Sequence, residues 1–375
     1  MSDLLTKYDA WLHDGGPAAL VIREHLMPVE GRDGVVFPAT FAAGDGFPGG
    51  YNIDGPFNGQ PGGENVCLID SVGSQANRVE PVFARERYQG LVPQVVIMAS
   101  EEKKVNLLDA GHRAGDAIAR CTSLATDIKK AFKDVLRGDA GPLAKIAPTS
   151  LVFGVWDSRD TQAKLPRVVA STIRAFNVRV LTRGAVYVPP LDYSALEVFS
   201  EEDKSKAEGN KKSPLAQRGF VHNPASGSHG GVIATGGIRR YATLNLAALR
   251  LLKAGADESA TLALRRYILG LSLVAFTHPS AFVGYLRQGC TLVLDPDAKP
   301  APREFSLVHP DGRRDPQRIT HDEARKYAND AAQKFGVGES KTVEFCKKLA
   351  QSDVAETKSG KKARKSKKAS AEATE

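Results

Sequence analysis

Cysteines and long hydrophobic runs are scarce in this sequence of 375 residues, and each scarcity excludes a class of protein. The four cysteines stand far apart and form no CxxC pair, which excludes a zinc ribbon and a thioredoxin-like motif. The longest strongly apolar run, residues 268–276, is about half of the roughly 18 residues that a membrane span requires. The first residues include early acids and no apolar core, unlike a signal peptide. We therefore expect a soluble cytoplasmic protein with reduced cysteines and no membrane partner.

Positive charge is concentrated near the C-terminal end. Lysine and arginine outnumber aspartate and glutamate by 51 to 43, but residues 358–368 alone hold seven positive charges and no negative one. The rest of the chain is therefore close to neutral, and any nucleic-acid surface on it should be a local patch or groove. We expect residues 356–375 to be a disordered basic tail that attracts polyanions without fixing their position.

Strand and helix patterns alternate irregularly along the rest of the chain, which indicates an α+β fold. Two polar excursions interrupt them, a glycine- and proline-rich loop at 31–63 and a charged segment at 191–229. A helical segment at 101–147 also stands out, and 296–355 reads as a linker followed by a helix. Apolar spacing predicts strands at 19–25, 65–70, 92–99, 150–156, 178–181, 185–188, 231–235 and 290–294. It predicts helices at 75–83, 107–136, 165–176, 259–276 and 322–335.

The first candidate site lies where the strand at 65–70 meets the following helix. Ser74 could cap that helix, which would leave Gln75, Asn77 and Arg78 in its first turn. Free backbone N–H groups at a helix start suit phosphates, and an arginine adds a bidentate donor. The alternative is an ordinary capped helix with a solvated arginine.

The second candidate site follows Trp156 and is rich in basic residues. A tryptophan beside cations is what single-stranded nucleic acid requires, because the ring stacks on bases and the cations neutralise phosphates. The alternative, which the apolar pattern favours for Trp156, is a core tryptophan beside solvated arginines. The candidate residues after Trp156 are Ser158, Arg159, Lys164, Arg167 and Arg174.

The third candidate site is the segment His229-Gly-Gly-Val-Ile-Ala-Thr-Gly-Gly-Ile-Arg239-Arg240. Two glycine pairs followed by two arginines fit a backbone that runs close to a ligand, and they fit tight turns equally well. The segment lacks the ending of a P-loop and the spacing of a dinucleotide fingerprint. His222 and His229 have no third ligand nearby, so we expect no metal.

Few features of the sequence point to an enzyme. It contains no GxSxG elbow, no HExxH and no paired carboxylates on one element. We therefore expect no catalytic residue, no cofactor and no enzymatic activity.

Taken together, three blocks of sequence resemble the RAMP-type backbone subunits of type I CRISPR effector complexes, in particular the type I-G branch (formerly I-U). The blocks are NVCLIDSVGSQANRVEPVF, SLVFGVWDSRDTQAKLPRVVASTIRAF and GGVIATGGIRR, and the resemblance spans residues 18–295. Such subunits typically carry Ser-Ser-Gln-x-x-Lys-Arg at the helix start. Here residues 73–78 stand in that place, with Asn77 where relatives often have lysine.

The resemblance implies a modified RRM-like (ferredoxin-like) palm over residues 1–295. Its insertions would be the 31–63 loop, the helical 101–147 segment and a thumb-like element at 191–229. It also implies a non-catalytic subunit whose copies stack head to tail along a CRISPR RNA and present it to a target DNA strand. Further partners would be other subunits of the effector complex and the helicase-nuclease that the complex recruits. The RRM aromatic signature is absent, so the guide would be held through its backbone.

Two other functions stay open at this point. The chain could be an RNA-cleaving RAMP endoribonuclease that uses a loop aspartate. It could also be a free-standing single-stranded nucleic-acid-binding regulator, which would need no head-to-tail surface.

Overall fold

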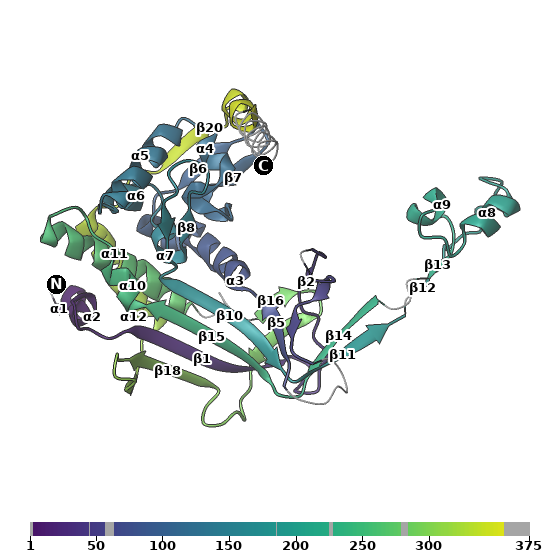
Figure 1. The fold of residues 1–375 in the computed structure, drawn as a ribbon, viewed down its shortest axis with the longest axis horizontal. Helices are drawn as coiled ribbons and strands as arrows, with labels where there is room; N and C mark the ends of the chain where they lie inside the picture. The colour runs from purple at the N-terminus through teal and green to yellow at the C-terminus, as the bar shows by residue number, and fades with distance from the viewer. Residues whose placement is uncertain are drawn as a thin grey trace, which may run out of the picture.

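The computed structural model describes residues 3–44, 46–56, 64–184, 186–224, 228–278 and 284–355. The expected basic tail at 356–375 lies outside the described residues, as does part of the 31–63 loop. The fold is α+β, as the sequence predicts, and it is built on a curled antiparallel sheet (Figure 1).

The central sheet has the strand order of a ferredoxin-like fold. Its middle strands run in the order β17-β1-β15-β10, and neighbouring strands are antiparallel. Helix α3 (Val72–Val79) lies between β1 and β10 along the chain, and α11 (Glu258–Thr277) lies between β15 and β17, which gives the split β-α-β arrangement. The strands are β1 (Ala19–Pro28), β4 (Ile53–Asp54), β5 (Val66–Asp70), β10 (Val169–Phe176), β15 (Ile238–Asn245), β16 (Gly284–Arg287), β17 (Cys290–Leu294), β18 (Arg303–Val308) and β19 (Arg314–Pro316).

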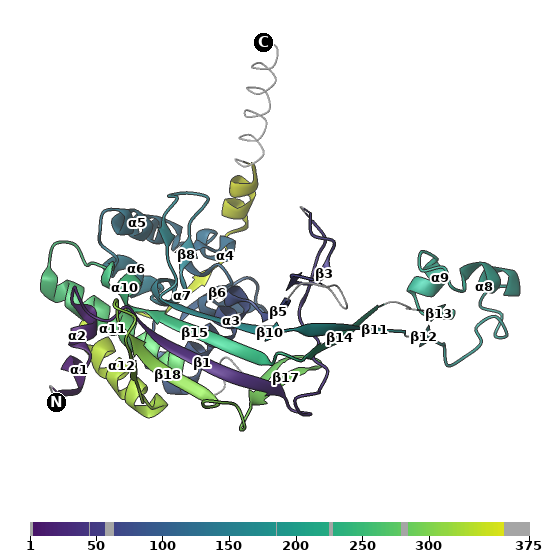
Figure 2. The ribbon, with the colours of Figure 1, turned by 60° about the horizontal axis from the view of Figure 1, so that its bottom comes forward.

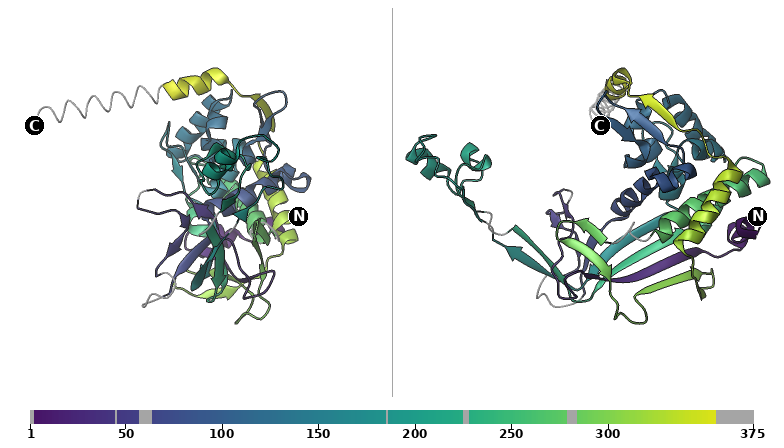
Figure 3. Two further views of the ribbon diagram at one scale, coloured as in Figure 1. Left: turned by 90° about the vertical axis from the view of Figure 1, so that its right-hand side faces the viewer. Right: turned by 180° about the vertical axis from the view of Figure 1, so that it is seen from behind.

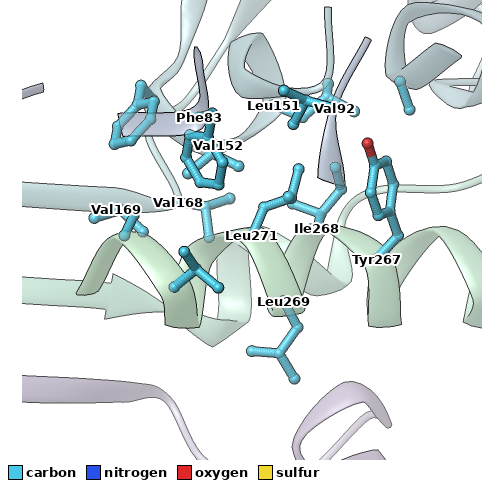
Figure 4. Close-up of a cluster of buried hydrophobic side chains, with 14 of the residues drawn as sticks. Phe83, Val92, Leu151, Val152, Val168, Val169, Tyr267, Ile268, Leu269 and Leu271 are labelled. Atoms are coloured by element: carbon cyan, nitrogen blue, oxygen red, sulfur yellow. The ribbon is translucent and has the colours of Figure 1, made fainter. Parts of the chain in front are cut away.

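Helix α11 forms the centre of the hydrophobic core. Its side chains point to both sides, with Tyr267 and Leu271 toward Val92 and Leu151 and with Leu269 in the opposite direction (Figure 4). Helix α12 (His321–Phe335) packs so closely on it that a Cβ at Gly270 would lie 2.8 Å from the Ala328 Cα. Although α11 is long and apolar enough to cross a membrane, 61% of that stretch is buried inside the protein, as in the core helix of a soluble protein.

A second layer covers α11 on the side away from the sheet. It contains the helices α4 (Ala117–Arg120), α5 (Ala125–Leu136), α6 (Gly141–Ile146) and α7 (Thr149–Phe153). It also contains a small sheet in which β20 (Lys341–Glu344) pairs in parallel with β6 (Val95–Met98), and β6 pairs with β7 (Lys104–Asn106). Residues 341–344 therefore return to a segment more than 200 positions earlier. Short helices α1 (Asp3–Thr6), α2 (Asp9–Leu12) and α10 (Leu246–Arg250) lie at the end of the sheet where β1 begins.

An arm projects from the opposite end of the sheet, away from the start of β1 (Figures 1 and 3). Its stalk is the antiparallel pair β11 (Val178–Arg183) and β14 (Ser228–Ala234). Its tip carries β12 (Val186–Tyr187), β13 (Asn223–Pro224), α8 (Glu201–Ala207) and α9 (Pro214–Gln217), with a small apolar cluster of its own. The arm includes the described residues of the 191–229 segment and rises on the same side of the sheet as the second layer. The hairpin of β2 (Thr40–Phe41) and β3 (Gly50–Tyr51) stands at its base.

Two of the expected elements are wrong. Residues 165–176 form no helix, because β10 occupies 169–176 between β15 and β5. The expected strand at 150–156 is instead α7 followed by the two residues of β8 (Val155–Trp156). In addition, 107–136 is a single helix only from Ala125, since two 3-10 turns and α4 precede it.

Candidate nucleic-acid interface

Four separate segments meet around a cavity of about 670 Å³ beside α3. Its walls come from α3, from the turn at 111–113, from β8 and from β9 (Lys164–Leu165) with the residues after it. Among the described residues that line it, none is acidic. The lining includes five of the candidate residues named from the sequence, namely Asn77, Trp156, Ser158, Lys164 and Arg167. We call this cavity the groove.

The Trp156 side chain is 56% exposed in the groove, so the core position that the sequence favoured for it is wrong. Trp156 is opposite Lys164 in the short β8–β9 pair, and the Lys164 Nζ lies 5.5 Å from the centre of the indole ring. This is a cation–π contact, which holds the ammonium group next to a flat stacking surface. The pair therefore offers both of the groups that a single-stranded nucleic acid needs.

The loop between β8 and β9 is held by Asp157, whose side chain is buried. Its carboxylate accepts hydrogen bonds from the backbone N–H groups of Asp160 and Thr161 and from the Thr161 hydroxyl. Ser158 and Arg159 lie exposed on this loop. Asp157 is thus occupied in fixing the loop.

Arg167 is exposed at the mouth of the groove, and its Nε donates to the Phe153 carbonyl at 3.0 Å. The Arg167 side chain lies close to Gly154. At Gly154 φ is 78°, and a Cβ there would lie 2.8 Å from the Arg167 Cγ. Only glycine fits this approach without strain. Behind the groove, Arg113 forms a buried ion pair with Glu80 at 2.7 Å. Burial raises the pKa of the Glu80 carboxyl, and the Arg113 guanidinium opposes that shift.

The helix that carries Ser74, Gln75, Asn77 and Arg78 begins one turn earlier than expected. Its N-cap is Ser71, whose hydroxyl accepts from the Ser74 backbone N–H at 3.2 Å, so the expected cap at Ser74 is wrong. Asn77 alone of these four is exposed, and it lines the groove. Its side-chain oxygen lies 3.5 Å from an Arg113 nitrogen.

The other three motif residues point toward the buried carboxylate of Asp70. That carboxylate accepts from the Ser74 hydroxyl (2.8 Å), the Gln75 Nε2 (2.7 Å) and the Arg78 Nε (3.2 Å). A fourth donor is Arg287 on β16, at 2.7 Å. Arg78 also donates to the Leu286 carbonyl, and 31% of its side chain is exposed.

From Asp70 a chain of polar contacts crosses the helix-covered face of the sheet. The Ser171 hydroxyl on β10 donates to Gln75, and the Arg240 guanidinium on β15 contacts Ser171 at 3.4 Å. Arg240 is buried and paired with the buried Glu24 on β1, which also binds Arg303 on β18. Burial would raise the pKa of Glu24, but these two arginines outweigh it and lower that pKa. We call this chain, from Arg303 to Arg287, the polar belt.

The polar belt separates two hydrophobic clusters. Leu20, Ile22 and Leu244 belong to the large core around α11, while Leu26 and Ile238 on the same strands belong to a second cluster toward the arm. Gln75 and Arg240, both candidate RNA contacts, are therefore part of the interior network.

The remaining candidates lie outside the groove. Arg174 on β10 and Arg239 on β15 lie on the sheet face that the helices leave open. His229 is exposed at the base of the arm, with its ring 4.8 Å from the Tyr51 ring. The sequence reasoning missed His112, Arg113 and Arg287, because no local motif marks them and only the tertiary fold brings them to the site.

The fold and the groove define a ferredoxin-like α+β protein with a projecting arm and a basic surface groove. Residues 20–180, somewhat less than half of the chain, match the family model described as CRISPR-associated protein GSU0053. The matched part of the chain is thus similar to a CRISPR-associated protein family. A comparison with curated proteins finds no match.

Proposed function

We propose that the protein is a non-catalytic backbone subunit of a CRISPR effector complex of the type I-G branch, which binds the CRISPR RNA in its groove. The observation that carries this proposal is the groove itself. Trp156, Lys164, Arg167 and Asn77 come from two distant segments of the chain and meet in a groove whose described lining residues include no carboxylate. Cations and neutral donors hold phosphates, and they leave base edges free to pair with a target DNA strand.

The arm supports head-to-tail stacking of copies along the guide. Its tip, residues 186–224, has six acidic and five basic residues, a net charge of −1, so it offers no excess of positive charge to phosphates. It does expose apolar side chains to at least half of their surface, including Val188 (66%), Leu191 (56%) and Leu196 (58%). A surface of this kind suits a protein neighbour, and we assign it to the next copy in the complex.

The absence of nuclease activity is part of the proposal, and the positions of two carboxylates beside the candidate segments support it. Asp70 and Asp157 are both buried, and their oxygens are occupied by donors from their own segments or from Arg287. Neither is placed to hold a metal ion against an RNA strand. We therefore expect the purified protein to leave RNA intact in the presence of Mg²⁺.

Copurification tests the proposal most directly. The affinity-purified chain should carry RNA of defined length in a particle far larger than 40.2 kDa. The triple variant W156A/K164Q/R167Q should lose that RNA, whereas R137Q, which removes an exposed arginine that does not line the groove, should retain it. A monomer that carries no RNA, or RNA retained by the triple variant, would contradict the proposal. Metal-dependent RNA cleavage would favour the endoribonuclease alternative instead.

The head-to-tail contact has a separate test. The variant V188S/L191S should shorten the particle measured by light scattering while each copy still binds RNA. The matched control L136S removes a similarly exposed leucine (59%) from the second layer, and it should leave the particle size unchanged.

A further inference from the structure

The face of the sheet that α11 does not cover carries an unusual row of cations. On β15, Ala242 and Leu244 point into the core, so the alternating residues Arg239 and Tyr241 point to the opposite face. The pairing register places Arg239 directly opposite both Arg174 on β10 and His25 on β1. Tyr241 is in turn opposite Arg23. We call this surface the arginine face, and Figure 2 shows the strands that form it from below.

Arg174 and Arg239 are neighbours of like charge. Directly opposite residues on a sheet have Cβ atoms only about 5 Å apart, and two like charges there are destabilising. Neither arginine forms an ion pair with a carboxylate among the residues that the structure describes. The nearby Glu304 on β18 is directed to Arg23 and His25, each at 3.8 Å. The arrangement therefore costs stability and is relieved by an anion from outside.

Both guanidinium groups are held in place by the protein while donors remain available. The Arg239 guanidinium carbon lies 4.3 Å from the centre of the Phe176 ring, and one terminal nitrogen of Arg239 donates a hydrogen bond to the Gly236 carbonyl. Its Nε is buried without a hydrogen-bond partner. One terminal nitrogen of Arg174 donates a hydrogen bond to the Thr172 hydroxyl at 3.1 Å. Arginines that are already ordered lose little conformational entropy when they bind a phosphate.

We propose that the arginine face is a second binding site, for the phosphate backbone of a nucleic-acid strand other than the one in the groove. The two sites lie on opposite sides of the sheet, since α3 and the groove are on the covered side. The same stretch of strand cannot reach both. The half-buried Tyr241, with Arg23 5.9 Å from its ring centre, adds an aromatic surface beside the cations. The chemistry is that of phosphate recognition, which an RNA strand or a DNA strand can supply.

The test compares the double variant R174Q/R239Q with R137Q, which removes an exposed arginine beside Asp134. Binding of a single-stranded RNA and of a DNA of equal length is measured by fluorescence anisotropy over a range of salt. The plot of log affinity against log salt should become shallower by about 0.7 for each lost phosphate contact. The probe that shows this change identifies the strand. Because the variant removes like-charge repulsion, its Tm should stay level or rise.

Combination with the groove variant separates this proposal from the proposed function. If the sites are independent, W156A/K164Q/R167Q should keep the binding that R174Q/R239Q removes, and the two losses should add. If R174Q/R239Q leaves both salt plots unchanged, or lowers the Tm, the arginine-face proposal is wrong and the groove proposal stands. If only the groove variant has no effect, the groove proposal fails and the arginine face stands.

Discussion

The buried carboxylate of Asp70 is the single group on which the structure of the motif helix most depends. The substitution Asp70→Asn keeps the shape of the side chain but removes its charge. The carboxylate now accepts hydrogen bonds from Ser74, Gln75, Arg78 and Arg287. In the variant, the amide nitrogen is itself a donor and would face some of these donor groups. Both arginines would also lose their counter-ion.

The expected cost follows from these contacts. Removal of one partner from a buried ion pair costs about 3–5 kcal/mol when the other charge stays buried. Here Arg78 and Arg287 are 31% and 24% exposed, so water compensates part of that loss. We therefore expect D70N to lower the free energy of unfolding by about 3 kcal/mol. Arg287→Gln leaves Asp70 with Arg78 and two neutral donors, and it should cost about 1–2 kcal/mol.

Urea unfolding followed by circular dichroism measures both variants, with the slope m checked so that the midpoint reports stability. The control is Asp160→Asn, which breaks only the exposed pair with Lys129 and should cost less than about 1 kcal/mol. A D70N protein as stable as D160N would refute the view that Asp70 organises this network.

Three further predictions concern other parts of the chain. Trp156→Ala should weaken single-stranded RNA binding by about 1–3 kcal/mol with little change in Tm, because the ring is mostly exposed. Burial, followed by a neighbouring histidine and arginines, lowers the pKa of His278 to about 4. As pH drops, His278 of the unfolded chain therefore takes up a proton before His278 of the folded protein does. The free energy of unfolding should fall by about 1–2 kcal/mol between about pH 6.5 and pH 4, a value reduced to allow for partial exposure of the ring. His278→Gln should flatten that part of a Tm–pH curve. Burial raises the pKa of Cys67 to about 12 and of Cys290 to about 11, so a thiol reagent at pH 8 should label the partly exposed Cys346 well before either, as mass spectrometry of the native protein can show.

Elements whose burial is simple could be predicted from the sequence. The second half of α11, from Tyr267 to Phe276, is apolar on nearly all sides because it lies between the sheet and the second layer. The strand β17 and the start of β1 were placed correctly by their apolar patterns. The buried half of α11 has apolar surroundings on every side, and β1 alternates regularly between buried and half-buried residues, so in both cases the pattern of side chains reports the surroundings directly.

The strand β10 could not be recognised by its period. It lies between two strands and is buried at 169, 171, 172, 173 and 175, so the alternation of period two is blurred. The apolar residues that remain happen to match helical spacing. The β-branched residues at 168, 169, 172 and 173 were the better signal, since they favour strands. The exposure of Trp156 follows from the short hairpin of β8 and β9, which the apolar run at 150–156 conceals because it matches a buried strand.

The motif helix shows why candidate contact residues can be correct in position yet divided in role. Residues four apart lie on one side of a helix, and Gly73 and Asn77 line the groove together. Gln75 and Arg78, three apart, turn to Asp70 on the adjoining side. Because one face is fixed to the sheet by the polar belt, the other face is held at a constant position against Arg113 and the residues after β9. The motif thus keeps the groove in shape through its buried residues, and it offers Asn77 to the ligand.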